Sequence, residues 1–408
     1  MTTTVSLADI RQARAELEGI SIYTPLEGAR WLSEHLGAQV WLKAENLQRT
    51  GSFKIRGAYV RIKNLSDEEK ARGVVAASAG NHAQGVALAA KMLGIQATVY
   101  MPEGAPIPKL NATRGYGAEV RFHGQFLDES LVEARKFADE TGAVLIHPFD
   151  HTDIVRGQGT CGLEIFEQAP DAKTIIVPLG GGGFLAGIAI AVKESCREAG
   201  LPLPRIIGVQ AKDAAAYPTS LAQGHPVAAQ HMKTMADGIA VGLPGMVPFE
   251  AIQEYVDEVI TVSETAMSRA MVALLERAKL VVEPAGAAAV AALVETPEAF
   301  NDDTVAVLSG GNVDPLLMGK LIRSGMAAAG RYLRATVHIP DVPGGLAKLV
   351  TELASLGANV IEVAHERVSA ELRYDEVSVR LQLETRGTEH AAAVIDRLTE
   401  LGYTVHAN

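Results

Sequence analysis

The chain has 408 residues, of which 48% are hydrophobic and 21% charged, and its formal net charge is −11. This length is too great for one ordinary core, so two or three domains are expected, and an acidic chain without a Lys/Arg cluster argues against nucleic acid or anionic membrane as the main partner. The first residues carry no basic segment followed by an apolar stretch and no later run is long enough to cross a bilayer, so we expect a cytoplasmic protein that does not interact with membranes.

Short β-rich segments alternate with helical stretches through the first three quarters of the chain. We expect strands at 40–43, 73–76, 97–100, 119–122, 144–146, 174–178, 205–209 and 304–308. Such alternation is typical of parallel sheets wrapped by helices, and so many strands favour two lobes over one sheet. Because open α/β sheets bind ligands beyond the carboxyl ends of their strands, we expect a ligand between the lobes.

Lys54 is the first residue with candidate chemistry, in the segment Thr-Gly-Ser-Phe-Lys-Ile-Arg-Gly-Ala at 50–58. It is expected at the start of a helix, where burial and the positive end of the helix both disfavour its charge. A neutral lysine can form a Schiff base with an aldehyde. Taken alone, however, a lysine is far more often a surface residue.

The segment Ser78-Ala79-Gly80-Asn81-His82 follows an expected strand and opens a helix. Ser78 and the backbone N–H groups after it can hold a carboxylate there. Without further context the segment is only a good helix N-cap, and His82 alone is more often structural.

Cys161 and Cys196 are the only cysteines. They lack metal-ligand spacing and are too few for a disulfide framework, which fits a reducing compartment. We expect both in the core.

Gly180, Gly181, Gly182 and Gly183 follow a strand and precede an apolar helix, so backbone N–H groups can converge on a phosphate. A rival interpretation is dinucleotide binding, since Gly181, Gly183 and Ala186 meet a relaxed G-x-G-x-x-A pattern. The next strand ends in Val-Gln at 209–210, without an acid for a ribose, and no Lys-Ser or Lys-Thr pair completes a P-loop.

Three later segments, 235–240, 281–287 and 309–312, also carry polar residues beside glycines. Asp237 is expected to be a turn residue, with Gly238 allowing close approach of the backbone. Glu283 precedes a proline that can start a helix, so helix initiation competes with a catalytic role. Ser309 follows a strand, and a plain turn residue is the alternative to a functional hydroxyl.

The character of the sequence changes after residue 330. A strand at 334–339, a helix opening at 344–350, strands at 359–363 and 376–383, a helix around 390–401 and a strand at 403–405 fit one βαββαβ unit. We therefore expect a catalytic domain at 1–330, its smaller lobe at roughly 50–150, and a separate domain at 334–408.

These segments resemble the active site of threonine dehydratases, which are pyridoxal-phosphate (PLP) enzymes of the tryptophan-synthase-β-like fold, fold type II. The tail resembles an ACT regulatory domain, a ferredoxin-like βαββαβ unit, and the two resemblances together cover nearly the whole chain. The first resemblance implies that Lys54 is the catalytic lysine, that Asn81 binds the phenolic oxygen of PLP, and that Ser309 binds the pyridine nitrogen. The implied cofactor-binding residues are Lys54, Phe53, Asn81, Gly180, Gly181, Gly182, Gly183, Gly238, Glu283 and Ser309. The implied substrate-carboxylate residues are Ser78, Ala79, Gly80, Asn81 and His82.

The reaction implied is β-elimination of L-threonine to 2-oxobutanoate and ammonia, with L-serine giving pyruvate. A hydroxyl rather than a carboxylate at the pyridine nitrogen makes the cofactor a weaker electron sink, which favours prompt elimination over racemisation. Ala79 stands where similar serine racemases have a serine that acts as acid/base, which also disfavours racemisation. Those relatives bind a divalent metal where this chain has Gln210 and Ala216, so no metal is expected, although Asp213 nearby keeps the question open.

The expected partners are an amino-acid substrate, an amino-acid effector and further copies of the chain, as a homodimer or homotetramer. Allosteric control would act through Gly344, Gly345 and Asn359 of the ACT-like unit. A role in isoleucine biosynthesis is implied, but there is one such unit where biosynthetic threonine dehydratases commonly have two. The alternatives are a dehydratase of serine, 3-hydroxyaspartate or phenylserine, a non-catalytic amino-acid sensor and, least favoured, a dinucleotide-dependent oxidoreductase.

Overall fold

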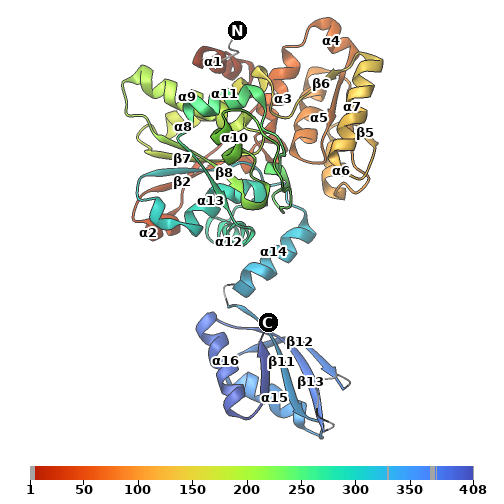
Figure 1. The fold of residues 1–408 in the computed structure, drawn as a ribbon, viewed down its shortest axis with the longest axis vertical. Coiled ribbons are helices and arrows are strands. Elements are labelled where there is room, and N and C mark those ends of the chain that lie inside the picture. The colour runs from red at the N-terminus through yellow and green to blue at the C-terminus, as the bar shows by residue number, and fades with distance from the viewer. Residues whose placement is uncertain (1–4, 329, 368–372, 374, 408) are drawn as a thin grey trace. The chain divides into compact units, whose positions relative to one another are not determined.

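The computed structural model describes residues 5–328, 330–367, 373 and 375–407, drawn in Figure 1. The chain divides into two compact units, Met1–Asp314 and Pro315–Asn408. This division lies earlier than the boundary expected from the sequence, because helix α14 (Pro315–Ala328) groups with the second unit. In the described part of the chain, no helix has both the length and the apolar character needed to cross a membrane.

The larger sheet of the first unit has six strands in the order β1-β2-β10-β7-β8-β9. Five are parallel, and β1 pairs antiparallel with β2 at one edge. The bounds are β1 (Leu26–Gly28), β2 (Val40–Ala44), β7 (Thr174–Pro178), β8 (Arg205–Ala211), β9 (Glu258–Val262) and β10 (Thr304–Leu308). The strands β7 and β10 are buried along their whole length, which explains their continuous apolar sequences.

Helices cover both faces of this sheet, and we call the assembly the large lobe (Figure 1). One face packs on α8 (Thr152–Gln168), α9 (Gly183–Ala199) and α11 (Met246–Tyr255), whose apolar residues share a core with β7 and β10. The other face packs on α13 (Pro284–Glu295), which contacts β7 to β10 and lies against α12 (Glu264–Ala273). Cys161 and Cys196 are both buried, as the sequence predicts.

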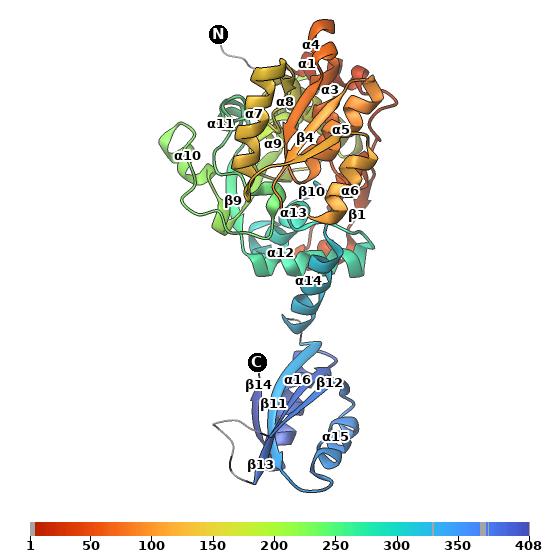
Figure 2. The same ribbon diagram turned by 90° about the vertical axis from the view of Figure 1, so that its right-hand side faces the viewer.

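The smaller sheet has four parallel strands in the order β5-β4-β3-β6. Their bounds are β3 (Val74–Ala77), β4 (Ala97–Met101), β5 (Glu119–Phe122) and β6 (Val144–Leu145). Helices α3 (Lys54–Lys63) and α5 (Asn81–Leu93) share one core with the sheet, and α7 (Leu127–Thr141) packs on its other side, as Figure 2 shows around β4. With α6 (Ile107–Gly115) these elements form the small lobe.

The remaining elements of the first unit are short. They are the helices α1 (Leu7–Glu16), α2 (Arg30–Leu36), α4 (Asp67–Arg72) and α10 (Tyr217–Gln223), and the helical turns η1 (Glu45–Leu47), η2 (Arg49–Gly51), η3 (Lys212–Ala214), η4 (Asp237–Ile239), η5 (Leu274–Ala278) and η6 (Pro297–Ala299). The sequence analysis missed β1 and β9, because β1 has three residues and β9 mixes charged and apolar residues without a long apolar run.

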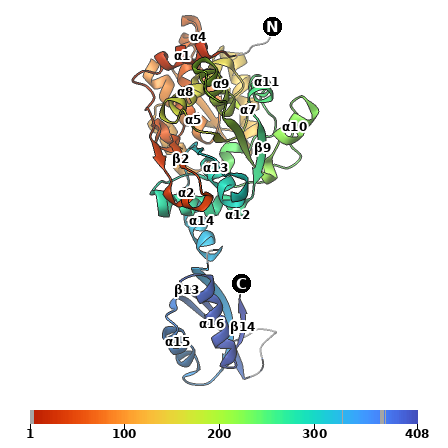
Figure 3. The same cartoon turned by 90° about the vertical axis from the view of Figure 1, so that its left-hand side faces the viewer.

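After α14, the second unit has the predicted βαββαβ order and a four-stranded antiparallel sheet, β12-β13-β11-β14. Its elements are β11 (Tyr332–Pro340), α15 (Gly345–Ser355), β12 (Asn359–Glu366), β13 (Glu376–Glu384), α16 (Thr388–Glu400) and β14 (Thr404–Ala407). Both helices cover the same face of the sheet (Figure 3), where Leu349 and Val394 meet Val337 and Val379 in one core.

Candidate active site

Lys54 is the first residue of helix α3, and the residues just before it are bonded to the end of β10. Ser52 forms a β-bridge with Gly310, and the Phe53 N–H donates to Ser309 O at 3.2 Å. The Lys54 Nζ donates to Pro148 O at 3.0 Å. Burial lowers the pKa of Lys54 to about 8, against the opposing charge of Glu283, so the neutral fraction of this amine at neutral pH is far greater than that of an ordinary lysine.

A buried ion network supports helix α3 from behind. Arg56 is bound by Glu45 through Nε and Nη2, at 2.8 Å each, and its Nη1 lies 2.7 Å from Glu164. Glu164 also pairs with Lys43 at 2.6 Å. The two cations and two acids balance, so burial of these charges is matched by pairing, and the network fixes α3 to β2 and α8.

The four glycines form the turn between β7 and α9, and two of them leave no room for a side chain. A Cβ on Gly181 would overlap the Phe149 ring, and one on Gly182, which has a φ of +100°, would overlap the Tyr217 hydroxyl. The N–H groups that open a helix have no acceptor within it, and this helix has 17 residues. The turn therefore has the form of an anion cradle.

The segment 78–82 joins β3 to α5. The Gly80 N–H donates to Ser78 Oγ at 3.1 Å, which tightens the turn. His82 is buried with its Nε2 2.8 Å from Ile146 O, and burial lowers its pKa to about 3. His82 is therefore neutral, carries its proton on Nε2 to face a carbonyl, and anchors the turn.

Asn81 and Glu283 join the two lobes inside the site. Asn81 Nδ2 donates to Glu283 Oε1 at 2.5 Å, and Asn312 Nδ2 donates to Asn81 Oδ1 at 2.8 Å. Burial raises the pKa of Glu283 to about 7, with a further contribution from the charge of Asp237. Glu283 is the N-cap residue of α13 but makes no side-chain capping bond, so its carboxyl is directed to the site although Pro284 starts the helix.

Gly238 and Ser309 complete the wall on the large lobe. A Cβ on Gly238 would lie 2.9 Å from the Ala285 Cβ, so this turn requires glycine. Ser309 is 4% exposed and directly follows β10. Asp237 is a turn residue, as predicted, but its carboxylate also pairs with Lys109 of α6 at 2.6 Å.

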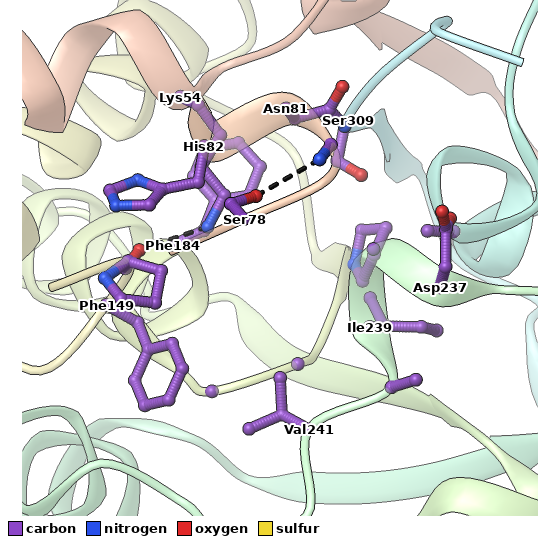
Figure 4. Close-up of a pocket in the computed structure, with 18 of the residues that line it drawn as sticks. Lys54, Ser78, Asn81, His82, Phe149, Phe184, Asp237, Ile239, Val241 and Ser309 are labelled. Carbon is purple, nitrogen blue, oxygen red and sulfur yellow. Dashed lines mark hydrogen bonds between the residues drawn. The ribbon is translucent and has the colours of Figure 1, made fainter. Parts of the chain in front are cut away.

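Lys54, the glycine turn, the segment 78–82, Glu283, Gly238 and Ser309 surround one cavity of about 320 Å³, shown in Figure 4. Every catalytic, cofactor and carboxylate residue expected from the sequence lines it: Phe53, Lys54, Ser78, Ala79, Gly80, Asn81, His82, Gly180, Gly181, Gly182, Gly183, Gly238, Glu283 and Ser309. The sequence analysis missed Lys109, Pro148, Phe149 and Phe184 on the wall and Asn312 behind it. Only Asn312 had a sequence signal, its place in the segment 309–312.

The regulatory candidates do not meet within one copy of the second unit. Gly344, with a φ of +88°, is the N-cap of α15, and a Cβ on Gly345 would lie 2.8 Å from Pro340 O. Asn359 instead pairs with Glu384 at the other end of the sheet. Eight strand steps separate these ends, roughly 26 Å at ~3.3 Å per residue.

Gln210 and Ala216 stand where the similar racemases are expected to carry the acids of a metal site. Gln210 is buried and its Oε1 accepts from the Tyr217 N–H at 2.9 Å. Within the described ranges of the chain, no three His, Cys, Asp or Glu side chains are grouped as ligands for a metal.

A partly buried amine of lowered pKa, facing an anion cradle across a cavity between two α/β lobes, is the arrangement expected of an enzyme that binds a phosphorylated aldehyde. Residues 18–310 match the model of the family described as "Pyridoxal-phosphate dependent enzyme". The chain belongs to this family, and its cofactor is pyridoxal 5′-phosphate.

Two curated relatives match nearly the whole chain, and two solved structures match 80% of it. The chain is 42% identical to an L-threonine ammonia-lyase of Thermotoga maritima over 98% of this chain and 99% of that protein. It is 46% identical to an L-threonine ammonia-lyase of Geobacter sulfurreducens over 94% of each. The structure of the processed form of threonine deaminase isoform 2 from Solanum lycopersicum is similar with a TM-score of 0.74 and 36% identity, covering 80% of this chain and 91% of that one. Maize serine racemase has a TM-score of 0.72 and 34% identity over 80% and 99%.

The residues of the cavity fit the cofactor. Gly181 and Gly182 lie too close to Phe149 and Tyr217 to carry a Cβ, so the turn that opens α9 requires glycine, and the N–H groups of such a turn can hold a phosphate. Lys54 Nζ lies at the wall with a lowered pKa, as attack on an aldehyde requires. The volume lies at the lower end of the range for small-molecule sites, about 300–1,000 Å³.

Proposed function

We propose that this protein is an L-threonine ammonia-lyase, which converts L-threonine to 2-oxobutanoate and ammonia and also accepts L-serine. The observation that carries the proposal is the single cavity shared by Lys54, the glycine cradle, Asn81 and Ser309. The two full-length relatives named as L-threonine ammonia-lyases support the choice of substrate. L-Serine lacks only a methyl group, which costs about 1–3 kcal/mol of discrimination.

The chain's residues divide the work of holding the cofactor. The N–H groups at 180–183 would hold its phosphate, Asn81 would bind its phenolic oxygen, and Ser309 would bind its ring nitrogen. When bound, the cofactor withdraws electrons from the α-carbon of the substrate. Phe53, stacked on Phe184 with ring centroids 3.9 Å apart, forms part of the same wall.

Lys54 is the base that removes the α-proton of the substrate. Its pKa of about 8 places it close to the working pH, where a base is most efficient. Ala79 carries no proton donor, so no group from this position delivers a proton to the opposite face. Elimination is therefore favoured over racemisation.

The carboxyl group of Glu283 also lies at this site and can carry a proton. With a pKa of about 7 it can be neutral or charged at working pH, and its partner Asn81 donates to it in either state. We assign it to positioning Asn81 rather than to the chemistry itself.

The test is an absorbance spectrum of the purified holoprotein, followed by L-threonine with 2-oxo acid and ammonia assayed together. A cofactor band with both products supports the proposal. If the cofactor band is present and L-threonine gives no product, but serine, 3-hydroxyaspartate or phenylserine does, that amino acid is the substrate instead of threonine. A band with no product from any of them favours the amino-acid sensor instead.

We propose further that the second unit is an ACT-like domain that binds an amino-acid effector. Its βαββαβ order and the glycine turn at 344–345 support this. Because Asn359 lies at the far end of the sheet, all three residues can contribute to one site only if two copies of the unit meet, which requires a homo-oligomer. Deleting residues 334–408 should abolish any amino-acid effect on rate, and unchanged regulation after the deletion would contradict the proposal.

A further inference from the structure

Lys109 is a cation inside the cavity with no role so far. It lies in the first turn of α6 in the small lobe, and its Nζ is 2.6 Å from Asp237 Oδ2 of the large lobe. The side chain of Lys109 is 9% exposed, whereas that of Asp237 is 61% exposed. The ammonium is therefore turned inward, and the carboxylate that it meets is at the solvent side.

The Lys109 ammonium also lies beside the turn at 78–82. A Cβ built on Gly80 would be 3.7 Å from Lys109 Nζ, so this amine faces the backbone where the carboxylate of an amino acid is expected to bind. Among the described residues that line the cavity, only Lys54 and Lys109 are basic side chains other than the neutral His82. Lys54 is committed to the cofactor.

The charge balance of the cavity requires such a cation. Asp237 and Glu283 are acids on the wall, and each repels an incoming carboxylate when it is charged. The turn at 78–82 offers N–H groups and a hydroxyl but no charge. Moving a carboxylate out of water is costly unless it is paired and hydrogen-bonded.

We propose that Lys109 is a substrate-binding residue that pairs with the α-carboxylate of the amino acid on the turn at 78–82, exchanging Asp237 for the substrate. An ion pair with a partner as exposed as Asp237 is weak, so the exchange costs little. Pairing with the inner carboxylate holds the small lobe against the substrate. This inference rests on the proposed function in one respect, that the substrate is an amino acid.

The alternative is that the Lys109–Asp237 pair only fastens the lobes together. The two roles differ in the effect of removing each partner. If the pair only joins the lobes, changing either partner should have the same effect on ligand binding. If Lys109 binds the carboxylate, changing Lys109 weakens carboxylate binding. Changing Asp237 does not weaken it, because Asp237 then no longer competes for Lys109.

The experiment uses the holoenzyme and two ligands without a β-leaving group, L-alanine and its neutral amide, L-alaninamide. Dissociation constants come from the change in cofactor absorbance. In Lys109→Met, L-alanine should bind about 10- to 150-fold more weakly, the value of a charge-assisted hydrogen bond, while L-alaninamide changes little. Asp237→Asn, the matched variant, should bind L-alanine as tightly as the wild type or more tightly, and Lys109→Arg should recover part of the loss.

If L-alanine and L-alaninamide both bound equally more weakly to Lys109→Met and to Asp237→Asn, the proposal would be overturned and the pair would only join the lobes. A wild-type enzyme that binds L-alanine no better than L-alaninamide would also overturn it. If Lys109→Met lost turnover of 3-hydroxyaspartate alone, the cation would serve a side-chain carboxylate instead. Because the alanine pair reports no turnover, these outcomes are independent of whether L-threonine is the preferred substrate. If Lys109→Met lost the cofactor band, Lys109→Gln and Asp237→Asn would carry the same comparison.

Discussion

Removal of Arg56 should destabilise the protein strongly, because its guanidinium is buried between two carboxylates. Glu45 is fully buried and makes two hydrogen bonds to Arg56, while Glu164 keeps its second cation, Lys43. In Arg56→Met, Glu45 is left as an unpaired buried charge, and breaking a buried pair in this way costs about 3–5 kcal/mol. That is a large part of the typical free energy of unfolding of about 5–15 kcal/mol.

The loss of stability in Arg56→Met should depend on pH in a characteristic way. Burial alone would raise the pKa of Glu45, but Arg56 holds it below the ordinary value. The pairing therefore contributes stability at neutral pH that is lost as pH falls through the lowered pKa of Glu45. The difference between Arg56→Met and the wild type should shrink toward acid pH, where Glu45 is protonated in both.

The assay is urea unfolding of the apoprotein at several pH values, with Arg30→Met as control. Arg30 is 91% exposed and forms an i,i+4 pair with Glu34, so its removal should cost no more than about 0.5 kcal/mol. The double variant Glu45→Gln/Arg56→Met should recover part of the loss, because no buried charge remains without a partner. An Arg56→Met variant within about 1 kcal/mol of the wild type, or a double variant less stable than the single one, would refute the reasoning.

Three further predictions concern the cavity. Lys54→Ala should abolish the covalent cofactor bond and lower turnover by at least the roughly 10²- to 10⁴-fold that a general base contributes; retained turnover, measured by 2-oxo acid release, would contradict it. Reconstitution of the apoprotein with PLP should speed up with rising pH and level off above about 8, since burial lowers the pKa of Lys54 and only the neutral amine attacks; a rate independent of pH would be inconsistent with this. Gly181→Ala should weaken PLP binding in an absorbance titration by about 1–3 kcal/mol, because the added Cβ overlaps Phe149, whereas Gly104→Ala, with no atom within 4 Å, should not; equal effects would refute the cradle.

The sequence predicted most of the fold because the buried parallel strands are continuous apolar segments between helical ones. The strands β7 and β10 are examples, and the turns after them carry the glycines and Ser309. The edge strands β1 and β9 were missed, since edge strands need no such run. For the division between the units, the sequence showed the change of pattern near residue 334 but not that α14 groups with the second unit.

Site residues in short segments with glycines were found, whereas Lys109 and Phe149, which lie in segments without such a pattern, were not. Phe149 belongs to a loop after β6, and only the structure shows its ring against Gly181. Lys109 lies in a helix with no motif around it, and its partner Asp237 is 128 residues away. Contacts across the lobes depend on how two sheets meet, which local patterns do not encode.

The structure divides the site into a part fixed by backbone hydrogen bonds and a part held by three side-chain contacts. The backbone at 309–311 makes three hydrogen bonds to two segments: the Phe53 N–H donates to Ser309 O, the Gly311 N–H donates to Gly51 O at 2.8 Å, and the Glu283 N–H donates to Gly310 O at 3.0 Å. These bonds end on β10, the strand between β2 and β7, so Lys54, Glu283 and Ser309 keep their places.

The turn at 78–82 belongs to the small lobe and meets the large one through different chemistry. Asn81 bonds Glu283 and Asn312, and Lys109 beside the turn pairs with Asp237. Two of these partners on the large lobe, Glu283 and Asp237, are acids, and a substrate carboxylate resembles them. An amino acid that enters the cavity therefore competes for the donors that join this turn to the large lobe, so carboxylate binding and this lobe contact depend on the same side chains.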